Sequence, residues 1–181
     1  ATPHVGVHRY TFDANERPRL MIYASSHLST DGETDESEIT IVPGAGEVEG
    51  RCRLFDDFTQ RQGGLRAYFV AQFDPPFSEW GTWRKDAYDA GSTHDQAQAR
   101  NESLGAQLGY ARSGQRQAIT VKVGLSYVSI ANARENLLAE APAGTGFDAV
   151  KARATQTWEA TLGRAEISGG TADQKEIFYT A

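Results

Sequence analysis

The chain has 181 residues, 18 Lys and Arg against 24 Asp and Glu, and a formal net charge of -6 at pH 7. This length holds one domain, or one domain with a short appendage, and the ordinary apolar and charged fractions indicate a folded protein. The chain is acidic overall and has no stripe of basic residues, so we do not expect a nucleic-acid partner. No apolar run approaches the ~18 residues of a membrane span, so we do not expect a membrane-spanning segment.

Alternating apolar residues predict β-strands over the first two thirds of the chain. Strands are expected at residues 4–12, 19–27, 38–42, 46–55 and 65–73. In the last of these, every second residue from Leu65 to Phe73 is apolar, which is the period of a half-buried strand. Residues 106–112 and 117–129 are expected to form a closing hairpin around Ser113-Gly114. Because no long helix separates these strands, the fold class is mainly β, an antiparallel β-sandwich.

Residues 74–105 are expected to form a long loop on the rim of the sandwich, because Asp74-Pro75-Pro76 ends a strand. The aromatic residues of this loop are Phe77, Trp80, Trp83 and Tyr88. Sugars present C–H faces that stack on exposed aromatic rings, so these side chains, with Arg84 as a hydrogen-bond donor, are candidates for carbohydrate binding. Packing of the loop against another domain is the favoured alternative, and Arg84 is then expected to pair with Asp86.

The apolar period changes to that of a helix after Ser129. Helices are expected at residues 131–140 and 147–162, the second with an apolar stripe of Phe147, Val150, Ala154, Trp158 and Leu162. This stripe packs either on the chain's own sheet or on another domain. A capping-box pattern, Thr171-x-x-Gln174, predicts a last helix that reaches Ala181 without a terminator. We therefore expect a chain cut from a longer polypeptide, as its start without methionine also indicates.

No metal site is expected from the residues themselves. The acidic residues Asp31, Glu33, Asp35, Glu36 and Glu38 lack the glycine that a calcium-binding loop has at position six, so a solvated turn is expected there. The single cysteine, Cys52, excludes an intrachain disulfide, and it is expected to be a small buried residue on a strand.

Three stretches of the sequence resemble glycoside hydrolase family 92, the bacterial calcium-dependent exo-acting α-mannosidases. They are Phe69 to Phe77 followed by Trp80-Gly81-Thr82-Trp83, then Val121 to Ile130 continuing into Ala133 to Leu137, and finally Gly169-Gly170-Thr171 followed by Gln174 and Ile177 to Ala181. The opening Pro3 to Tyr10 is similar to the same family. The resemblance covers almost the whole chain in the family's order.

The resemblance implies an N-terminal β-sandwich of the galactose-mutarotase-like supersandwich type, a helical linker and an (α/α)6 barrel. Residues 1–129 would be the later, partial portion of the sandwich, 130–170 the linker, and 171–181 the start of the first barrel helix. The family's catalytic Glu and Asp lie in the barrel, beyond Ala181, so no catalytic residue and no metal ligand is expected in this chain. Calcium is expected only in the parent enzyme.

The expected function is that of a scaffold fragment from a secreted or cell-surface bacterial enzyme that removes terminal α-linked mannose with inversion. Its partners would be upstream sandwich strands, the downstream barrel and a mannose-containing glycan, and the isolated chain is expected to be inactive. If upstream strands are missing, at least one sheet edge should lie open. A free-standing, non-catalytic carbohydrate-binding module is the alternative, and an adhesion or assembly protein is a third possibility.

Overall fold

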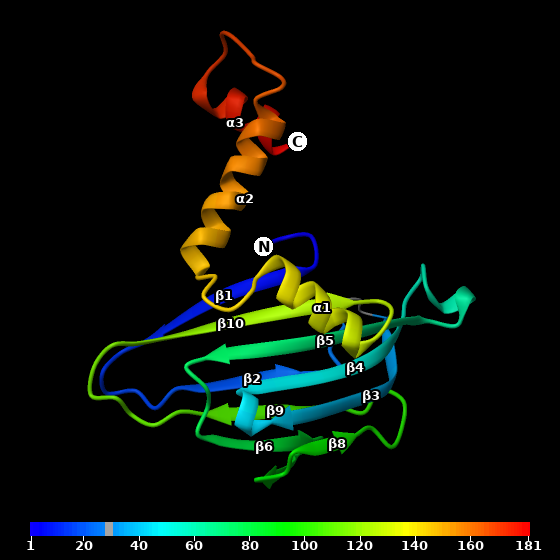
Figure 1. Ribbon diagram of the computed structural model, residues 1–181. Helices are drawn as coiled ribbons and strands as arrows, with labels where there is room; N and C mark the ends of the chain where they lie inside the picture. The colour runs from blue at the N-terminus through cyan, green and yellow to red at the C-terminus, as the bar shows by residue number, and fades with distance from the viewer. Residues whose placement is uncertain (28–30) are drawn as a thin grey trace.

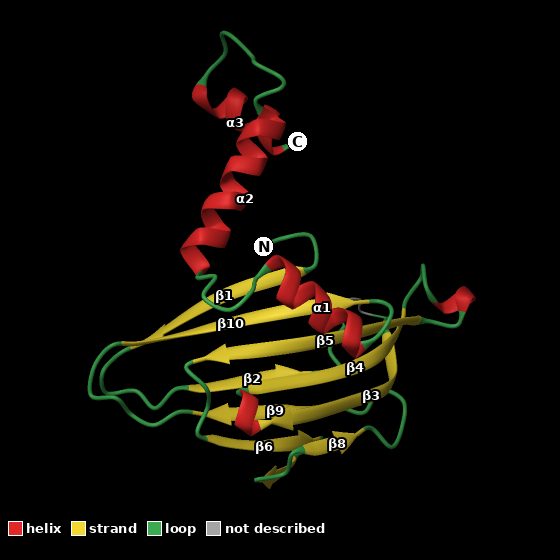
Figure 2. Cartoon of the chain, viewed as in Figure 1, coloured by secondary structure: helices red, strands yellow, loops and turns green. Residues whose placement is uncertain are grey.

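The computed structural model describes residues 1–27 and 31–181, and the chain forms two packed antiparallel sheets with three helices on one side (Figure 1 and Figure 2). The six-stranded sheet has the order β1 (Val5–Phe12), β10 (Gln117–Ser126), β5 (Leu65–Asp74), β4 (Glu47–Phe55), β3 (Glu33–Val42), β8 (His94–Gln96). The four-stranded sheet has the order β2 (Arg19–Tyr23), β9 (Leu104–Gly109), β6 (Glu79–Arg84), β7 (Ala87–Ala90). Short 3-10 turns lie at Pro43–Ala45 and Gln60–Gln62. The predicted antiparallel sandwich is confirmed.

The main core lies between the two sheets. Its buried side chains come from both inner faces, and include Ile39 of β3, Leu104 and Leu108 of β9, and Ile119 of β10. These residues sit at alternate positions of their strands, because successive side chains of a strand point to opposite faces. Burial of this apolar surface is the main force that holds the two layers together.

Helix α1 (Ile130–Glu140) lies on the outer face of the six-stranded sheet, across β10 and β5 (Figure 1). Ala133 and Leu137 of α1 are fully buried there. The helix approaches β10 closely at Gly124, where an added Cβ would stand 2.4 Å from the Ala133 carbonyl oxygen. At the start of the helix, the Ser129 hydroxyl accepts a hydrogen bond from the Asn132 amide, as an N-cap residue does.

Helix α2 (Phe147–Leu162) begins beside β1 and extends away from the sandwich, and α3 (Ala172–Thr180) lies against its far end (Figure 1). The Tyr179 hydroxyl donates a hydrogen bond to the Ala165 carbonyl oxygen at 2.9 Å. The predicted capping box is present, since the Thr171 hydroxyl accepts from the Gln174 amide and the Gln174 side chain accepts from the Thr171 amide. The predicted helix at residues 147–162 and the predicted last helix after Thr171 are both confirmed.

The expected rim loop at residues 74–105 is wrong, because this segment contains β6, β7 and β8. A two-residue turn, Lys85-Asp86, joins β6 to β7, with Lys85 at φ 55°. Such turns usually carry Asn-Gly, Asp-Gly or a glycine at the first central position, since one or both central residues need positive φ. Lys-Asp carries no such signal, so the hairpin was not visible in the sequence.

The expected hairpin of residues 106–112 and 117–129 is also wrong. β9 belongs to the four-stranded sheet and β10 to the six-stranded sheet, so the connection between them crosses from one layer to the other. Both strands alternate as predicted, but alternation shows only which face is apolar and not which strand is the neighbour.

Two strand boundaries differ from the expectation. The second strand is shorter than 19–27 and ends at Tyr23, while the third begins at Glu33 and not at residue 38. Four residues of the acidic run, Glu33, Asp35, Glu36 and Glu38, are therefore part of β3 and not of a solvated turn, while Asp31 lies in an exposed turn before the strand. A bulge between Asp35 and Glu38 lets Glu36 take φ 51°, which keeps the carboxylates of this strand beside arginines of the next strands.

One end of the interior between the sheets is open. β2 has a strand neighbour on one side only among the described residues, and the inner face of β10 continues past it to Leu125, which is 50% exposed. A hollow of about 320 Å³ lies there, lined by His8, Tyr10, Leu20, Met21, Ile22, Tyr23, Ala24, Phe69, Ala71, Phe73, Val121, Val123 and Leu125. An open edge, as expected, is present. Within the described residues, no helix has the length and apolar character needed to cross a membrane.

Candidate functional site

The residues singled out in the sequence lie on and around β6, but they divide between its two faces. Trp80 and Arg84 point toward the six-stranded sheet, on the same side as the fully buried Leu108 and Leu104, their register partners on β9. Trp83 points outward, opposite Gly105 of β9 on one side and Tyr88 of β7 on the other. A single contiguous aromatic patch is therefore not formed.

Phe77 and Trp80 contribute to the core. The Phe77 ring is buried and meets the Phe73 ring edge to face at 5.6 Å and the Trp80 ring at 6.2 Å between centroids. The Trp80 indole nitrogen donates a hydrogen bond to the Gly91 carbonyl oxygen at 3.3 Å. These contacts assign Phe77 to packing within the sandwich, and they leave Trp80 partly buried against the same core.

The outer face of the four-stranded sheet carries a row of aromatic side chains. Tyr23 of β2, Gly105 of β9, Trp83 of β6 and Tyr88 of β7 are successive register partners across the four strands. The Tyr23 and Trp83 rings meet edge to face, with 5.0 Å between their centroids. Tyr23 is 52% exposed and Tyr88 48%, while Trp83 between them is partly buried, so the row is open to solvent mainly at its two ends.

Two glycines explain how these rings are held. A Cβ placed on Gly105 would stand 2.5 Å from the Trp83 ring, and one placed on Gly81 would stand 2.6 Å from the Tyr88 hydroxyl oxygen. Each ring therefore lies across the neighbouring strand, in the space that a side chain would otherwise fill.

A groove of about 430 Å³ runs over this face beside Tyr88. It is lined by Arg19, Ser78, Glu79, Trp80, Tyr88, Ala90, Gly91, Gln107 and Gly109. Glu79 is paired with Arg17. The groove thus combines an aromatic ring, a small-residue floor and hydrogen-bonding groups of three kinds, a guanidinium, a carboxylate and a primary amide.

Arg84 lies in a separate, polar cleft of about 650 Å³ between β6, β7 and β8. The expected pairing with Asp86 is wrong: the Arg84 guanidinium lies 3.3 Å from the Asp95 carboxylate and 3.8 Å from that of Glu102. The buried Glu102 carboxylate also binds Lys85 Nζ at 2.8 Å, and this hydrogen bond lowers the pKa of Glu102 below its usual value. Because both arginine contacts are satisfied within the cleft, Arg84 is mainly a structural residue here.

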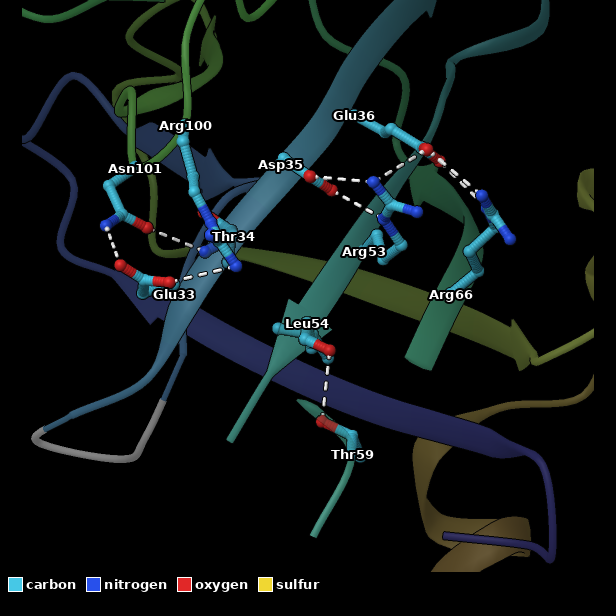
Figure 3. A network of polar contacts seen from close by, with 10 residues as sticks. All are labelled: Glu33, Thr34, Asp35, Glu36, Arg53, Leu54, Thr59, Arg66, Arg100 and Asn101. Atoms are coloured by element: carbon cyan, nitrogen blue, oxygen red, sulfur yellow. Dashed lines mark hydrogen bonds and ion pairs between the residues drawn. The ribbon is translucent and has the colours of Figure 1, made fainter. Parts of the chain in front are cut away.

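The acidic run of β3 is paired with arginines of neighbouring segments (Figure 3). Arg53 binds both oxygens of Asp35, at 2.7 and 2.8 Å, and Arg66 binds both oxygens of Glu36, at 2.8 and 3.0 Å. These guanidinium hydrogen bonds lower the pKa of Asp35 and of Glu36. Glu33 pairs in the same way with Arg100 at 2.9 Å.

These carboxylates do not fit a calcium site. A calcium ion takes 6–8 oxygen ligands, typically at about 2.3–2.6 Å, but each carboxylate of the run that Figure 3 draws already accepts from an arginine. Over residues 1–27 and 31–181, no group of three or more His, Cys, Asp or Glu side chains is placed to hold a metal ion.

Helix α2 carries a second exposed aromatic surface. Trp158 is 64% exposed, and with Phe147, Val150, Ala154 and Leu162 it lines a groove of about 380 Å³ that also reaches Val7 of β1. The predicted stripe is therefore divided, because Val150 is buried on the chain's own sheet while Trp158 is not. Arg9 fixes the start of the helix, since its guanidinium lies 4.5 Å from the Phe147 ring centre and 2.6 Å from the Asp148 carboxylate.

Sequence reasoning missed several residues of the outer face, namely Tyr23, Gly81, Gly105, Arg19 and Gln107. A signal was present for Tyr23, because its alternation with Ile22 places it opposite the core side of its strand. The pairing of β2 with β9 joins residues about 80 to 90 positions apart, and that of β9 with β6 joins residues about 20 to 30 positions apart. No local pattern predicts such a juxtaposition.

Comparison with known protein families gives two matches. Residues 1–126 match the profile described as "Glycosyl hydrolase family 92 N-terminal domain", and residues 132–181 match the one described as "Glycosyl hydrolase family 92 catalytic domain". No curated protein matches the chain. The division of residues 130–181 into a linker and a first barrel helix stays a prediction.

Comparison with solved structures gives the same family. One GH92 family glycosyl hydrolase matches with a TM-score of 0.82 and 26% identity, over 99% of this chain and 23% of that chain. A family GH92 inverting mannosidase from Bacteroides thetaiotaomicron VPI-5482 matches with a TM-score of 0.77 and 24% identity, over 99% of this chain and 22% of that one. A family GH92 α-mannosidase from Bacteroides thetaiotaomicron matches with a TM-score of 0.77 and 20% identity, over 99% of this chain and 23% of that one. This chain thus spans less than a quarter of the length of these relatives.

Proposed function

Because this chain belongs to glycosyl hydrolase family 92, we propose that it forms the sandwich scaffold and first helices of an enzyme that removes terminal α-linked mannose with inversion. The match of residues 1–126 to the family's N-terminal domain carries this proposal. The structural likeness over 99% of the chain supports it. The solved relatives of similar fold include an inverting mannosidase and an α-mannosidase, which is the reason for choosing mannose.

The chemical groups of the reaction would come from the barrel part of the enzyme. An inverting glycosidase needs a general acid and a general base about 6.5–9.5 Å apart, so that a water molecule fits between the base and the sugar. In the proposed enzyme both carboxyl groups, and the oxygen ligands of a calcium ion at the sugar, lie outside the described residues. The role of this chain is then to position the barrel, and not to transfer protons.

Two apolar surfaces support the proposed partners. The hollow beside β2, with Leu125 half exposed, would be covered by further sandwich strands of the same enzyme. The groove beside Trp158 would be covered by the catalytic barrel, since α2 and α3 extend away from the sandwich (Figure 1). Solvent-exposed apolar area of this kind commonly marks an interface. We place the enzyme outside the bacterial cell or on its surface, where glycans are degraded.

A free-standing carbohydrate-binding module is the second candidate. The open aromatic row of Tyr23, Trp83 and Tyr88 favours it, because such a module needs only a binding face. The two candidates differ in one respect: a module binds glycan by itself and hydrolyses nothing when the barrel is added.

The test is hydrolysis of α-linked mannobiose by a polypeptide that joins this chain to a GH92 barrel of a close relative. We expect turnover, with β-mannose as the first anomer seen by proton NMR, and loss of turnover when a chelator removes calcium. The barrel alone and the 181-residue chain alone are the controls, and both should be inactive. First appearance of α-mannose, or full activity of the barrel without the sandwich, would contradict the proposal.

A second variant keeps this test informative. Trp158→Ser removes the large exposed ring from α2 and leaves the sandwich core untouched. If the barrel covers this groove, Trp158→Ser should lower the midpoint temperature at which the barrel of the joined polypeptide unfolds. The isolated chain should not be destabilised. An equal effect in both proteins would show that Trp158 contacts no barrel.

A further inference from the structure

We infer that the outer face of the four-stranded sheet binds carbohydrate, with the rings of Trp83 and Tyr88 as a stacking platform for a neutral, mannose-containing glycan. The choice of mannose rests on the proposed function. The site itself rests on the geometry of β2, β9, β6 and β7, and it replaces the rim loop that the sequence alone had suggested.

The two aromatic rings lie across the neighbouring strands, over glycine positions. Trp83 lies over Gly105 and Tyr88 lies over Gly81, so neither ring stands upright from the sheet. The face of an aromatic ring is negatively polarised, and it attracts the C–H groups that one side of a pyranose presents. Tyr23, at the edge of Trp83, extends the row toward β2.

The polar groups around the rings suit hydroxyl groups. Arg19 and Gln107 line the groove beside Tyr88, and the described residues provide no ion-pair partner for Arg19. A guanidinium donates, a carboxylate such as that of Glu79 accepts, and the Gln107 amide does both. A sugar hydroxyl also donates and accepts, so it can use all three. The groove volume, about 430 Å³, lies in the ~300–1,000 Å³ range of small-molecule sites.

The surroundings favour a neutral sugar over a protein surface. α1 covers the opposite side of the sandwich, and α2 and α3 leave from that side, so the chain itself leads away from this face (Figure 1). Glu79 is paired with Arg17, so Arg19 is the one charged groove residue without an ion-pair partner among the described residues, and a single guanidinium can donate hydrogen bonds to neutral hydroxyl groups. The floor consists of glycine and other small residues, and it offers little of the buried aliphatic area on which protein interfaces depend.

The experiment is a titration of the 181-residue chain with α-linked mannotriose, followed by tryptophan fluorescence and by isothermal calorimetry. We expect a saturable signal, with affinity about tenfold weaker in Tyr88→Ala, a loss of about 1.4 kcal/mol in binding free energy, because this variant removes the ring on which the sugar stacks. Arg19→Ala should also weaken binding. Tyr127→Ala is the matched control, since Tyr127 is an exposed tyrosine outside the groove, and it should bind as the parent chain does.

Two results would overturn the inference. One is the absence of a saturable signal in a chain that circular dichroism shows to be folded. The other is binding that persists unchanged in both Tyr88→Ala and Arg19→Ala. Self-association abolished by Tyr88→Ala, with no response to the sugar, counts with the first result, because it assigns the face to a second copy of the chain.

This titration is independent of the hydrolysis test. Turnover by the joined polypeptide without mannotriose binding by this chain would overturn the inference and leave the proposed function intact. Mannotriose binding by this chain, without turnover by the joined polypeptide, would overturn the proposed function and leave the inference intact.

Discussion

The two outer faces of the sandwich use glycine for the same physical purpose and with different results. On the six-stranded sheet, Gly124 lets the backbone of α1 approach to within van der Waals contact, and the face is covered. On the four-stranded sheet, Gly105 and Gly81 let the rings of Trp83 and Tyr88 lie down, and the face stays open. Glycine thus allows close approach on both faces. On the covered face the backbone of a helix fills the space above the glycine, and on the open face an aromatic ring fills it.

The covered face also has stronger polar anchoring. Arg134 of α1 pairs with the buried Glu47 at 2.6 Å and with Glu49 at 2.6 Å, while Lys122 Nζ donates to the carbonyl oxygens of Ala141 and Pro142. Burial lowers the pKa of Lys122. The open face has the Arg17–Glu79 pair at its margin, and the described residues place no comparable ion pair beneath Tyr88. We therefore expect mutations on the two faces to differ in their effects on stability and on binding.

The largest expected effect is at the helix contact of the covered face. Leu137→Ala should lower the free energy of unfolding by about 2–5 kcal/mol, because the Leu137 side chain is fully buried against the six-stranded sheet. Its neighbour Leu138 is 55% exposed, so Leu138→Ala should change stability by less than ~0.5 kcal/mol. Urea unfolding followed by circular dichroism measures both. Equal losses would mean that α1 is not docked as described.

The next effect concerns the charge pair beneath α1. Arg134→Met should cost about 1–3 kcal/mol, because it leaves the buried Glu47 carboxylate without its main partner. We place the cost below that of a fully buried pair because Arg134 is more than a third exposed and is screened by solvent. Adding Glu47→Gln to this variant should recover part of the loss in the same urea experiment. No recovery would show that Arg134 acts through packing and not through charge.

A smaller effect is expected at low pH. The folded pKa values of Asp35 and Glu36 lie below their usual values of 3.8 and 4.5. Their ion pairs therefore stabilise the fold above about pH 4.5, and this contribution is lost as the pH falls through the folded pKa values. The double variant Asp35→Asn/Glu36→Gln should lose about 0.5–1 kcal/mol at pH 7 and little at pH 3.

The matched control for this pH dependence is Glu159→Gln, an exposed position on α2 that makes no ion pair within the described residues. It should leave the pH profile of the thermal midpoint unchanged. A double variant with the full pH dependence of the parent chain would contradict the role given to Asp35 and Glu36.

The smallest expected effect is on the open face. Tyr88→Ala should change the free energy of unfolding by less than ~0.5 kcal/mol, because the Tyr88 side chain is half exposed and β7 buries none of its four residues. Its effect on sugar binding should be larger than its effect on stability, the opposite of Leu137→Ala. A loss of stability above ~1 kcal/mol would indicate that the Tyr88 ring is part of the packing.

Several features were predictable from the sequence because they depend on local pattern. The alternation in β1, β5 and β10, the helix Phe147–Leu162 and the capping box at Thr171 each follow from a few neighbouring residues. Cys52 lies on a strand as predicted, and its partial burial raises the pKa of its thiol to about 11. The family resemblance was also readable, because its motifs are short and contiguous.

The tertiary structure alone decided where the strands pair and what each face carries. β6 and β7 join through Lys85-Asp86, a turn without the usual sequence, and β9 and β10 separate into different sheets although they alternate alike. Trp80 and Trp83 are three positions apart, but one enters the core and the other lies on the open face. The physical reason is that strand pairing is non-local: the sequence determines which side of each strand is apolar, while the partner strand determines what that side meets.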